Sequence, residues 1–175
     1  MKKLLAAVLL LAACNQQASV AGVVTFNEEA EKAALMKTIT AETETFYSRD
    51  YEGWKQNFVQ APYAFQGWSN GDGTFAASTG WVAIDKRIGD YIKSHPLAKG
   101  ESYYHNVQRK NMIVKFFSDS LAYLSWDQYN GDKENKWFTY SKDQRIMQKQ
   151  AGRWRIANVS SFWDYKNKVS IDSLL

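Results

Sequence analysis

The sequence predicts a single α+β domain in which N-terminal helices pack on a curved antiparallel sheet and form a cone with an internal pocket. Helical periodicity dominates residues 25–96, whereas strand-like runs separated by short turns fill residues 103–163. Helices followed by consecutive hairpins are typical of an α+β domain. The chain also contains 7 Trp, 10 Tyr and 9 Phe, all after residue 25. This content favours a thick core or an aromatic-lined cavity, because these rings bury large areas.

The first helix is expected over residues 25–49. Thr25 followed by Glu28 is typical of a capping box. Spacings of four and seven residues then define one face of the helix. The members of this face are Leu35, Ile39 and Phe46, with the carboxylate of Glu42 among them.

A short second helix and a first strand follow. Asp50 can cap a helix that continues through Phe58 and ends before Pro62. Residues 63–68 have strand character, and the sequence Ser-Asn-Gly-Asp-Gly at 69–73 is a dense turn signal.

A third helix is expected between Ser78 or Thr79 and Pro96. Its apolar residues recur at spacings of three and four, as one face of a packed helix requires. They are Trp81, Ile84, Ile88, Tyr91 and Ile92.

The C-terminal half is expected to be an antiparallel meander of four strands, because its strand-like runs are joined by short turns. The runs span residues 103–117, 121–129, 137–150 and 154–163. A bend or bulge is expected in the first run near Arg109, Lys110 and Asn111. The last dozen residues carry little pattern.

The N-terminus predicts export. Lys2 and Lys3 precede ten apolar residues, which are too few to span a bilayer and are typical of a signal peptide. The small residues and the lone Cys14 that end this run resemble the lipobox of bacterial lipoproteins. That resemblance implies a signal peptide over residues 1–13 and a lipid-modified Cys14.

The lipobox resemblance also predicts how the rest of the chain is organised. A tether over residues 14–24 would join the lipid to one domain over residues 25–175. Asn15 after the cysteine implies sorting to the outer membrane of the bacterial envelope. Ordinary signal cleavage after Ala21 is the alternative.

Composition narrows the expected partners. The 22 Lys and Arg exceed the 18 Asp and Glu by four, and removal of Lys2 and Lys3 with the signal lowers the net charge to +2. No run of basic residues exceeds two, so nucleic acid is not an expected partner.

Metal and cofactor chemistry is not expected either. Two histidines and one cysteine are too few for a conventional zinc cluster, and the turn at 69–73 has too few carboxylates for calcium. No phosphate-binding loop or dinucleotide fingerprint is present. The sequence therefore predicts no metal and no cofactor.

Several segments carry a family resemblance. They are residues 46–54 and 68–73, the helix from Gly80, the strand at 119–128 and the hairpin at 145–156. In this order they resemble the nuclear-transport-factor-2-like superfamily, which includes ketosteroid isomerases and polyketide-cyclase-like proteins, over about residues 27–163. The resemblance implies a cone with a pocket between sheet and helices, and a convex sheet face that can pair two subunits. It implies no single reaction, because different sites occur on such a fold.

Glu42 and His105 are the candidates for acid–base chemistry. Glu42 lies in an apolar stripe, where a carboxylate is costly unless it is paired or protonated, and Arg145 or a tyrosine hydroxyl is its expected partner. His105 lies in the first long strand, and a histidine can transfer protons near neutral pH. The alternatives are a structural ion pair for Glu42 and a backbone hydrogen bond for His105.

Strand alternation assigns the residues around position 127 to two faces. Trp126 and Gln128 are expected to point toward the pocket and Asp127 away from it. With Asp127 outside, the pocket carboxylate and oxyanion hole of ketosteroid isomerases find no residue-by-residue match. That activity is therefore not carried over to this chain.

The leading hypothesis is a membrane-anchored envelope protein that binds a small apolar or cyclic ligand. Pockets of this kind are mostly apolar with a few polar groups. The expected ligand-binding residues are Trp54, Tyr63, Phe65, Trp68, Trp81, His105, Trp126, Gln128, Arg145 and Trp163. Two alternatives stay open: a cofactor-independent enzyme of the proton-transfer isomerase, cyclase or hydratase type, and a structural envelope protein that forms homodimers.

Overall fold

The structure is a computed structural model that describes residues 26–99, 106–132 and 136–174. The expected signal peptide, Cys14, the tether and His105 lie outside these ranges. None of the described helices is both long enough and apolar enough to cross a membrane.

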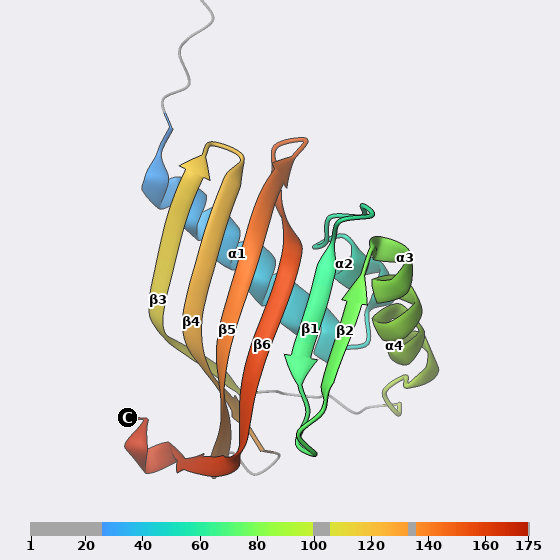
Figure 1. The fold of residues 1–175 in the computed structure, drawn as a ribbon, viewed down its shortest axis with the longest axis vertical. Coiled ribbons are helices and arrows are strands. Elements are labelled where there is room, and N and C mark those ends of the chain that lie inside the picture. The colour runs from blue at the N-terminus through green and yellow to red at the C-terminus, as the bar shows by residue number, and fades with distance from the viewer. Residues whose placement is uncertain (1–25, 100–105, 133–135, 175) are drawn as a thin grey trace, which may run out of the picture.

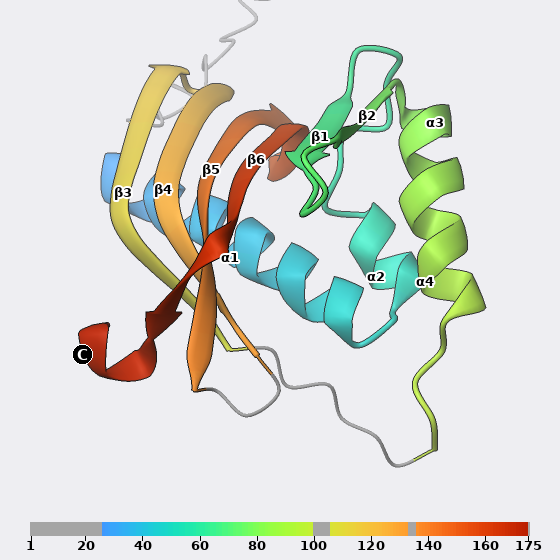
Figure 2. The same cartoon turned by 60° about the horizontal axis from the view of Figure 1, so that its bottom comes forward.

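Six strands form one curved sheet, and the long helix α1 crosses its concave face (Figures 1 and 2). The strand order is β2-β1-β6-β5-β4-β3. The strands are β1 (Phe65–Ser69), β2 (Phe75–Thr79), β3 (Val107–Ser118), β4 (Leu121–Gly131), β5 (Trp137–Gln150) and β6 (Arg153–Ser170). The helices are α1 (Glu28–Tyr47), α2 (Tyr51–Lys55), α3 (Trp81–Ile84) and α4 (Asp90–Ser94). This arrangement confirms the predicted α+β class.

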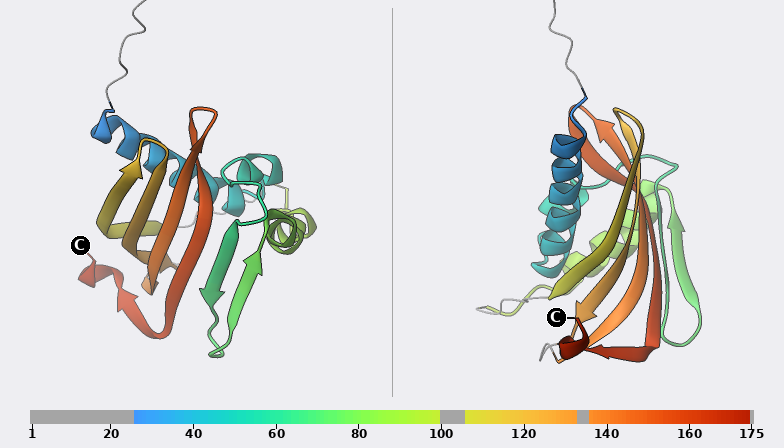
Figure 3. Two further views of the ribbon diagram at one scale, coloured as in Figure 1. Left: turned by 45° about the horizontal axis from the view of Figure 1, so that its top comes forward. Right: turned by 90° about the vertical axis from the view of Figure 1, so that its left-hand side faces the viewer.

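One detail of the predicted sheet was wrong. β1 pairs with β6 in parallel, with Phe65 opposite Asn158, so the sheet is mixed rather than wholly antiparallel. The parallel pair joins the N-terminal strands to the meander, and short-range pattern carries no signal for such a distant pairing. Viewed from the side in Figure 3, the sheet curves around α1 and leaves its edges open.

The N-cap of helix α1 lies two residues after the predicted cap, Thr25. Asn27 is the N-cap, and its side chain accepts a hydrogen bond from the backbone N–H of Ala30 at 3.1 Å. Leu35 and Ile39 are buried against the sheet, as the predicted face requires. The C-terminal half of the helix contributes Glu42, Thr43, Phe46 and Tyr47 to the lining of the pocket described below.

The predicted helix caps after α1 had different outcomes. Asp50 caps α2, as predicted, by accepting from the N–H of Gly53 at 2.9 Å. The third helix begins at Trp81 rather than at Ser78 or Thr79, because residues 75–79 form β2 beside β1. A serine or threonine before an apolar repeat is typical of an N-cap, and here the same residues end a strand.

Gly80 makes the change of direction between β2 and α3 possible. Its φ of +86° lies in the region that only glycine adopts without strain, and an added Cβ would lie 3.3 Å from the carbonyl oxygen of Pro62. A π-helical turn over Asp85–Gly89 then links α3 to α4. Pro96 follows the end of α4, as predicted.

The predicted meander is confirmed, with four shifts of register, two between β3 and β4 and two between β5 and β6. Asn111 in β3 has a φ of +53°, and the register with β4 shifts between Lys110 and Ile113, which is the predicted bulge. In β6 the register with β5 shifts between Asp164 and Lys168. The Asp164 carboxylate closes this second bulge by accepting from the N–H groups of Lys166 and Asn167 at 3.0 and 3.1 Å. The bulge interrupts strand alternation, which is why the sequence after 163 showed no pattern although β6 continues to Ser170.

Candidate functional site

A pocket of about 230 Å³ lies between the C-terminal half of α1 and the concave face of the sheet. Its walls come from α1, the π-helical turn and five of the six strands. The lining residues are Glu42, Thr43, Phe46, Tyr47, Gln66, Trp68, Ile88, Val107, Gln128, Asn130, Asp143, Arg145, Val159, Ser161, Trp163 and Tyr165. The pocket is therefore aromatic on one part of its surface and strongly polar on another.

The aromatic part includes a stacked pair on β6. The rings of Trp163 and Tyr165 lie 5.7 Å apart at 18°. The backbone N–H of Trp163 donates to the hydroxyl of Ser69 on β1 at 2.8 Å, which fixes this part of β6 against its neighbour. Trp68 on β1 contributes a further ring, over which the guanidinium of Arg87 lies at 4.8 Å. Flat faces of this kind suit a cyclic ligand.

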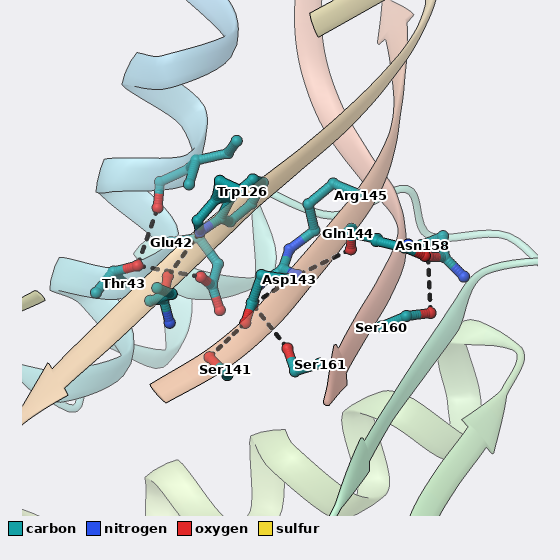
Figure 4. A network of polar contacts seen from close by, with 12 residues as sticks. Glu42, Thr43, Trp126, Ser141, Asp143, Gln144, Arg145, Asn158, Ser160 and Ser161 are labelled. Carbon is teal, nitrogen blue, oxygen red and sulfur yellow. Dashed lines mark hydrogen bonds and ion pairs between the residues drawn. The ribbon is translucent and has the colours of Figure 1, made fainter. Parts of the chain in front are cut away.

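The polar floor is organised around Asp143 on β5 (Figure 4). The hydroxyls of Ser141 and Ser161 each donate to its carboxylate at 2.7 Å. Arg145 forms an ion pair with the same carboxylate at 3.1 Å, and both charged side chains are buried. The Asp143 carboxylate is thus engaged by three protein donors.

Arg145 is held from several sides. Its Nη1 donates to the carbonyl oxygen of Gln144 at 2.9 Å, and its guanidinium lies 5.0 Å from the ring centre of Trp126. Its Nε has no hydrogen-bond partner among the described residues. Two more buried atoms of the lining share this property, Oε1 of Gln66 and Nδ2 of Asn130.

Glu42 contributes an acidic group to the pocket from α1. Desolvation by the surrounding protein raises the pKa of its carboxyl, and the charges of Arg145 and Arg109 oppose that rise. The nearby indole N–H of Trp54 also opposes it, although this atom forms no hydrogen bond of full geometry. The hydroxyl of Thr43 lies 3.4 Å from the carboxylate and also bonds the Ile39 carbonyl at 3.1 Å. The expected partner Arg145 therefore acts on Glu42 through space rather than by direct contact.

The raised pKa of Glu42 makes a prediction about pH. A carboxyl whose pKa is higher in the folded chain than the usual 4.5 binds more protons when folded. Its contribution to stability is therefore present below pH 4.5 and is lost as the pH rises through the folded pKa. Urea unfolding of the native chain and of Glu42→Gln across this range is expected to show a stability difference that changes with pH in this direction. A difference that stays constant with pH would contradict the raised pKa.

The structure separates the predicted ligand-binding residues into groups. Five of the predicted site residues line the pocket: Glu42, Trp68, Gln128, Arg145 and Trp163. Trp54, Trp81 and Trp126 pack in the core, with Trp54 stacked on Trp81 at 5.8 Å. Tyr63 and Phe65 line a separate groove with Leu121 and Ile146. His105 lies outside the described residues.

The predicted face assignment around position 127 is confirmed. Gln128 lines the pocket, and Trp126 lies fully buried on the same face. Asp127 lies on the opposite face, where its carboxylate accepts from Asn111, Tyr140 and Lys142 at 2.6, 2.9 and 3.0 Å. These contacts lower the pKa of Asp127 and tie the bulge of β3 to the sheet.

Several pocket residues were missed from the sequence. Asp143 lies two residues before Arg145, so the alternation that places Arg145 on the inner face also places Asp143 there. Asn130 follows Gln128 by the same rule. Gln66 precedes Trp68 by the same rule. Tyr165 had no such signal, because it belongs to the bulge of β6.

The fold and the pocket together define an α+β cone with an interior site. No protein-family model matches the sequence, and no curated protein matches it. Solved structures do. An NTF2-like protein of unknown function from Shewanella oneidensis aligns with a TM-score of 0.55 at 17% identity, over 75% of this chain and 98% of that chain.

Two further solved structures align comparably. A putative scytalone dehydratase from Novosphingobium aromaticivorans aligns with a TM-score of 0.59 at 12% identity, over 81% of this chain and 88% of its own. The association domain of C. elegans CaMKII gives 0.57 at 13% identity, over 77% and 96%. These likenesses show that the chain has the nuclear-transport-factor-2-like fold, as the sequence resemblance implied.

Proposed function

We propose that this protein binds a small cyclic molecule in its pocket, with a ring of the ligand against the aromatic side chains of β1 and β6 and a polar edge of the ligand on the floor. One observation carries the proposal. Three buried polar atoms of the lining, Gln66 Oε1, Asn130 Nδ2 and Arg145 Nε, lack partners among the described residues. A buried polar group without a partner is costly, and a ligand that bonds these atoms would remove the cost.

The polar floor of the pocket restricts the chemical class of ligand that the sequence predicted. A wholly apolar molecule would leave these atoms unpaired and would gain little from Asp143 or Arg145. A ring with hydrogen-bonding substituents matches both parts of the pocket. Of the two ligand classes that the sequence predicted, a cyclic molecule is therefore favoured over a purely apolar one.

Replacing Trp163 with alanine tests the aromatic part. The backbone bond from Trp163 to Ser69 is kept in this variant, so the loss is mainly the ring. We expect acetophenone, used as a ring probe, to quench tryptophan fluorescence of the native chain and to bind on the order of tenfold more weakly to Trp163→Ala.

The matched control for this experiment is Trp137→Ala. Trp137 is 51% exposed and does not line the pocket, so its removal is expected to leave the affinity for acetophenone unchanged. Equal affinities of the native chain and Trp163→Ala would contradict the proposed ring site.

Acid–base catalysis without a cofactor is the second candidate function. The observation that favours it is Glu42, which faces the pocket with a raised pKa and could move a proton to or from a bound ligand. The likeness to a putative scytalone dehydratase is compatible with such chemistry. Exchange of the methyl protons of acetophenone in D₂O, followed by NMR, tests it. Acceleration by the native chain that Glu42→Gln lacks would support catalysis, and exchange at the buffer rate would remove this candidate.

We also propose that a lipid on Cys14 anchors the protein in the bacterial envelope. Support comes from the N-terminal sequence and from the position of the pocket, which lies at the C-terminal half of α1, away from the end that continues to Cys14. Two or more acyl chains anchor a protein durably. The full chain is expected in the outer-membrane fraction and Cys14→Ala in the soluble fraction; equal distribution of both would contradict lipid anchoring.

We further propose that two copies of the chain pair through the outer face of the sheet. Exposed apolar side chains of this face include Ile113, Leu121, Ile146 and Phe162. Exposed apolar side chains on one face can pair two copies of a chain, and the likeness to an association domain is compatible with assembly. In sedimentation velocity, the native chain is expected to run as a dimer and Ile146→Lys as a monomer. A native chain that runs as a monomer would contradict the pairing.

A further inference from the structure

A chain of hydrogen bonds runs along the inner face of β4 and ends in the pocket. Nε1 of Trp126 donates to Oε1 of Gln128 at 3.1 Å, and Nε2 of Gln128 donates to Oδ1 of Asn130 at 3.1 Å. The three side chains alternate along one strand and therefore share one face. We call this series the β4 relay. Its last free atom is Nδ2 of Asn130, which has no partner among the described residues.

The direction of the β4 relay is fixed by its first member. An indole N–H only donates, so the amide of Gln128 must turn its oxygen toward Trp126. Its NH₂ group then faces Asn130, which must in turn present its own oxygen. The orientation of an amide is ordinarily open to a 180° exchange, but here each exchange would set two donors against each other. The free group at the end of the relay is therefore a donor.

Asn130 is well placed to use this donor on a ligand. It is 6% exposed and lines the pocket. Gly131 beside it is held by a backbone bond to the carbonyl of Asn106 at 2.8 Å, so the end of the relay sits on a paired strand.

The other polar groups of the pocket include a further free hydrogen-bond donor. Nε of Arg145 is a second free donor, and that side chain is also 6% exposed. The principal acceptor of the floor, the Asp143 carboxylate, is already occupied by Ser141, Ser161 and Arg145. Among the fully buried atoms of the lining, Oε1 of Gln66 is an acceptor without a partner in the described residues, and because this amide makes no other side-chain bond there it can rotate to donate instead. The Glu42 carboxyl, with the Thr43 hydroxyl at 3.4 Å, is a further acceptor of the lining and lies on α1 rather than on β4.

We infer that the pocket selects a cyclic ligand carrying an acceptor-only oxygen, a carbonyl or a carboxylate, which receives a hydrogen bond from Nδ2 of Asn130. This inference rests on the proposed binding of a cyclic molecule and adds the chemistry of the polar edge. An ammonium or amine at the same place would set donor against donor. Trp126 acts as a positioning residue, because it does not line the pocket and reaches Asn130 only through Gln128.

Three probes that share one ring test the selection. Acetophenone carries a carbonyl, benzoate a carboxylate and benzylamine an ammonium group. Isothermal titration of the native chain is expected to give an affinity for acetophenone, for benzoate or for both that is about tenfold or more above that for benzylamine, since one hydrogen bond and one clash separate them. The carbonyl and carboxylate arms distinguish a neutral from an anionic acceptor.

Asn130→Asp reverses the group at the end of the relay while keeping its shape. One carboxylate oxygen still accepts from Gln128, and the other becomes an acceptor where the donor stood. The preference is expected to fall by about tenfold or to invert toward benzylamine. Asn158→Asp is the matched control, because Asn158 lies on the outer face of the sheet; it is expected to leave all three affinities unchanged.

Trp126→Phe gives an independent reading if Asn130→Asp does not fold. Loss of the indole N–H frees Gln128 to turn, so the preference for acceptor probes is expected to shrink while the ring probes still bind. A merely structural role for Trp126 would weaken all three probes equally. Binding of the three probes within twofold of one another in the native chain, or a preference that neither variant changes, overturns the inference and leaves the proposed function standing. Failure of every probe to bind overturns the proposed function as well.

Discussion

Asp143→Ala is expected to lower the free energy of unfolding by about 3–5 kcal/mol, because it leaves the buried charge of Arg145 without its partner. Asp143 is 1% exposed, and the hydroxyls of Ser141 and Ser161 donate to the same carboxylate at 2.7 Å. The variant therefore leaves one buried cation and two buried hydroxyls without their shared partner. Urea unfolding followed by far-UV circular dichroism measures the loss.

The control for this prediction is a carboxylate on the surface. Asp90 lies 3.8 Å from both Lys86 and Lys93, and all three side chains are exposed to solvent. Exposed ion pairs contribute little to stability, so Asp90→Ala is expected to leave the unfolding midpoint unchanged within error. A small loss for Asp143→Ala, similar to that for Asp90→Ala, would show that the pocket floor is not held by this carboxylate.

Trp54→Ala is expected to cost about 3–5 kcal/mol of unfolding free energy, since it removes a fully buried ring from the core. Trp54 is 0% exposed and packs against Phe58 and Trp81, with ring centres at 4.8 and 5.8 Å. Thermal and urea unfolding measure the loss. Trp54→Phe is expected to cost much less, because the indole N–H of Trp54 has no hydrogen-bond partner among the described residues.

This prediction separates a core tryptophan from a ligand-binding one. If Trp54 formed a wall of the ligand site, its loss would weaken binding of a ring probe with little effect on folding. The structure places it outside the pocket lining, so any effect of Trp54→Phe on acetophenone affinity is expected to be far smaller than that of Trp163→Ala. The opposite ranking would be incompatible with the pocket described above.

Strict periodicity made much of the fold predictable from the sequence. The alternation of β4 correctly placed Gln128 inside and Asp127 outside, because nothing interrupts that strand. The helical face of α1 correctly grouped Leu35 and Ile39. The turn at 69–73 also lies between two elements, as expected, although the second of them is the short strand β2.

Two features of the structure could not be predicted from the periodicity of the sequence. The parallel pairing of β1 with β6 joins residues about ninety positions apart, and local propensity does not encode it. The division of the tryptophans between core and pocket depends on how the sheet curves around α1. Trp54 and Trp163 are chemically identical, and a charged residue follows each of them, Lys55 and Asp164, so only the three-dimensional arrangement tells them apart.

The most direct test of the ring site is fluorine NMR of the chain labelled with fluorotryptophan and titrated with acetophenone. Trp68 and Trp163 line the pocket, whereas Trp137 does not. Single Trp→Phe variants assign the resonances. We predict that the signals of Trp68 and Trp163 shift together as the probe is added and that the signal of Trp137 stays in place. Signals of Trp68 and Trp163 that remain fixed while the probe binds would contradict a ligand site between α1 and the sheet.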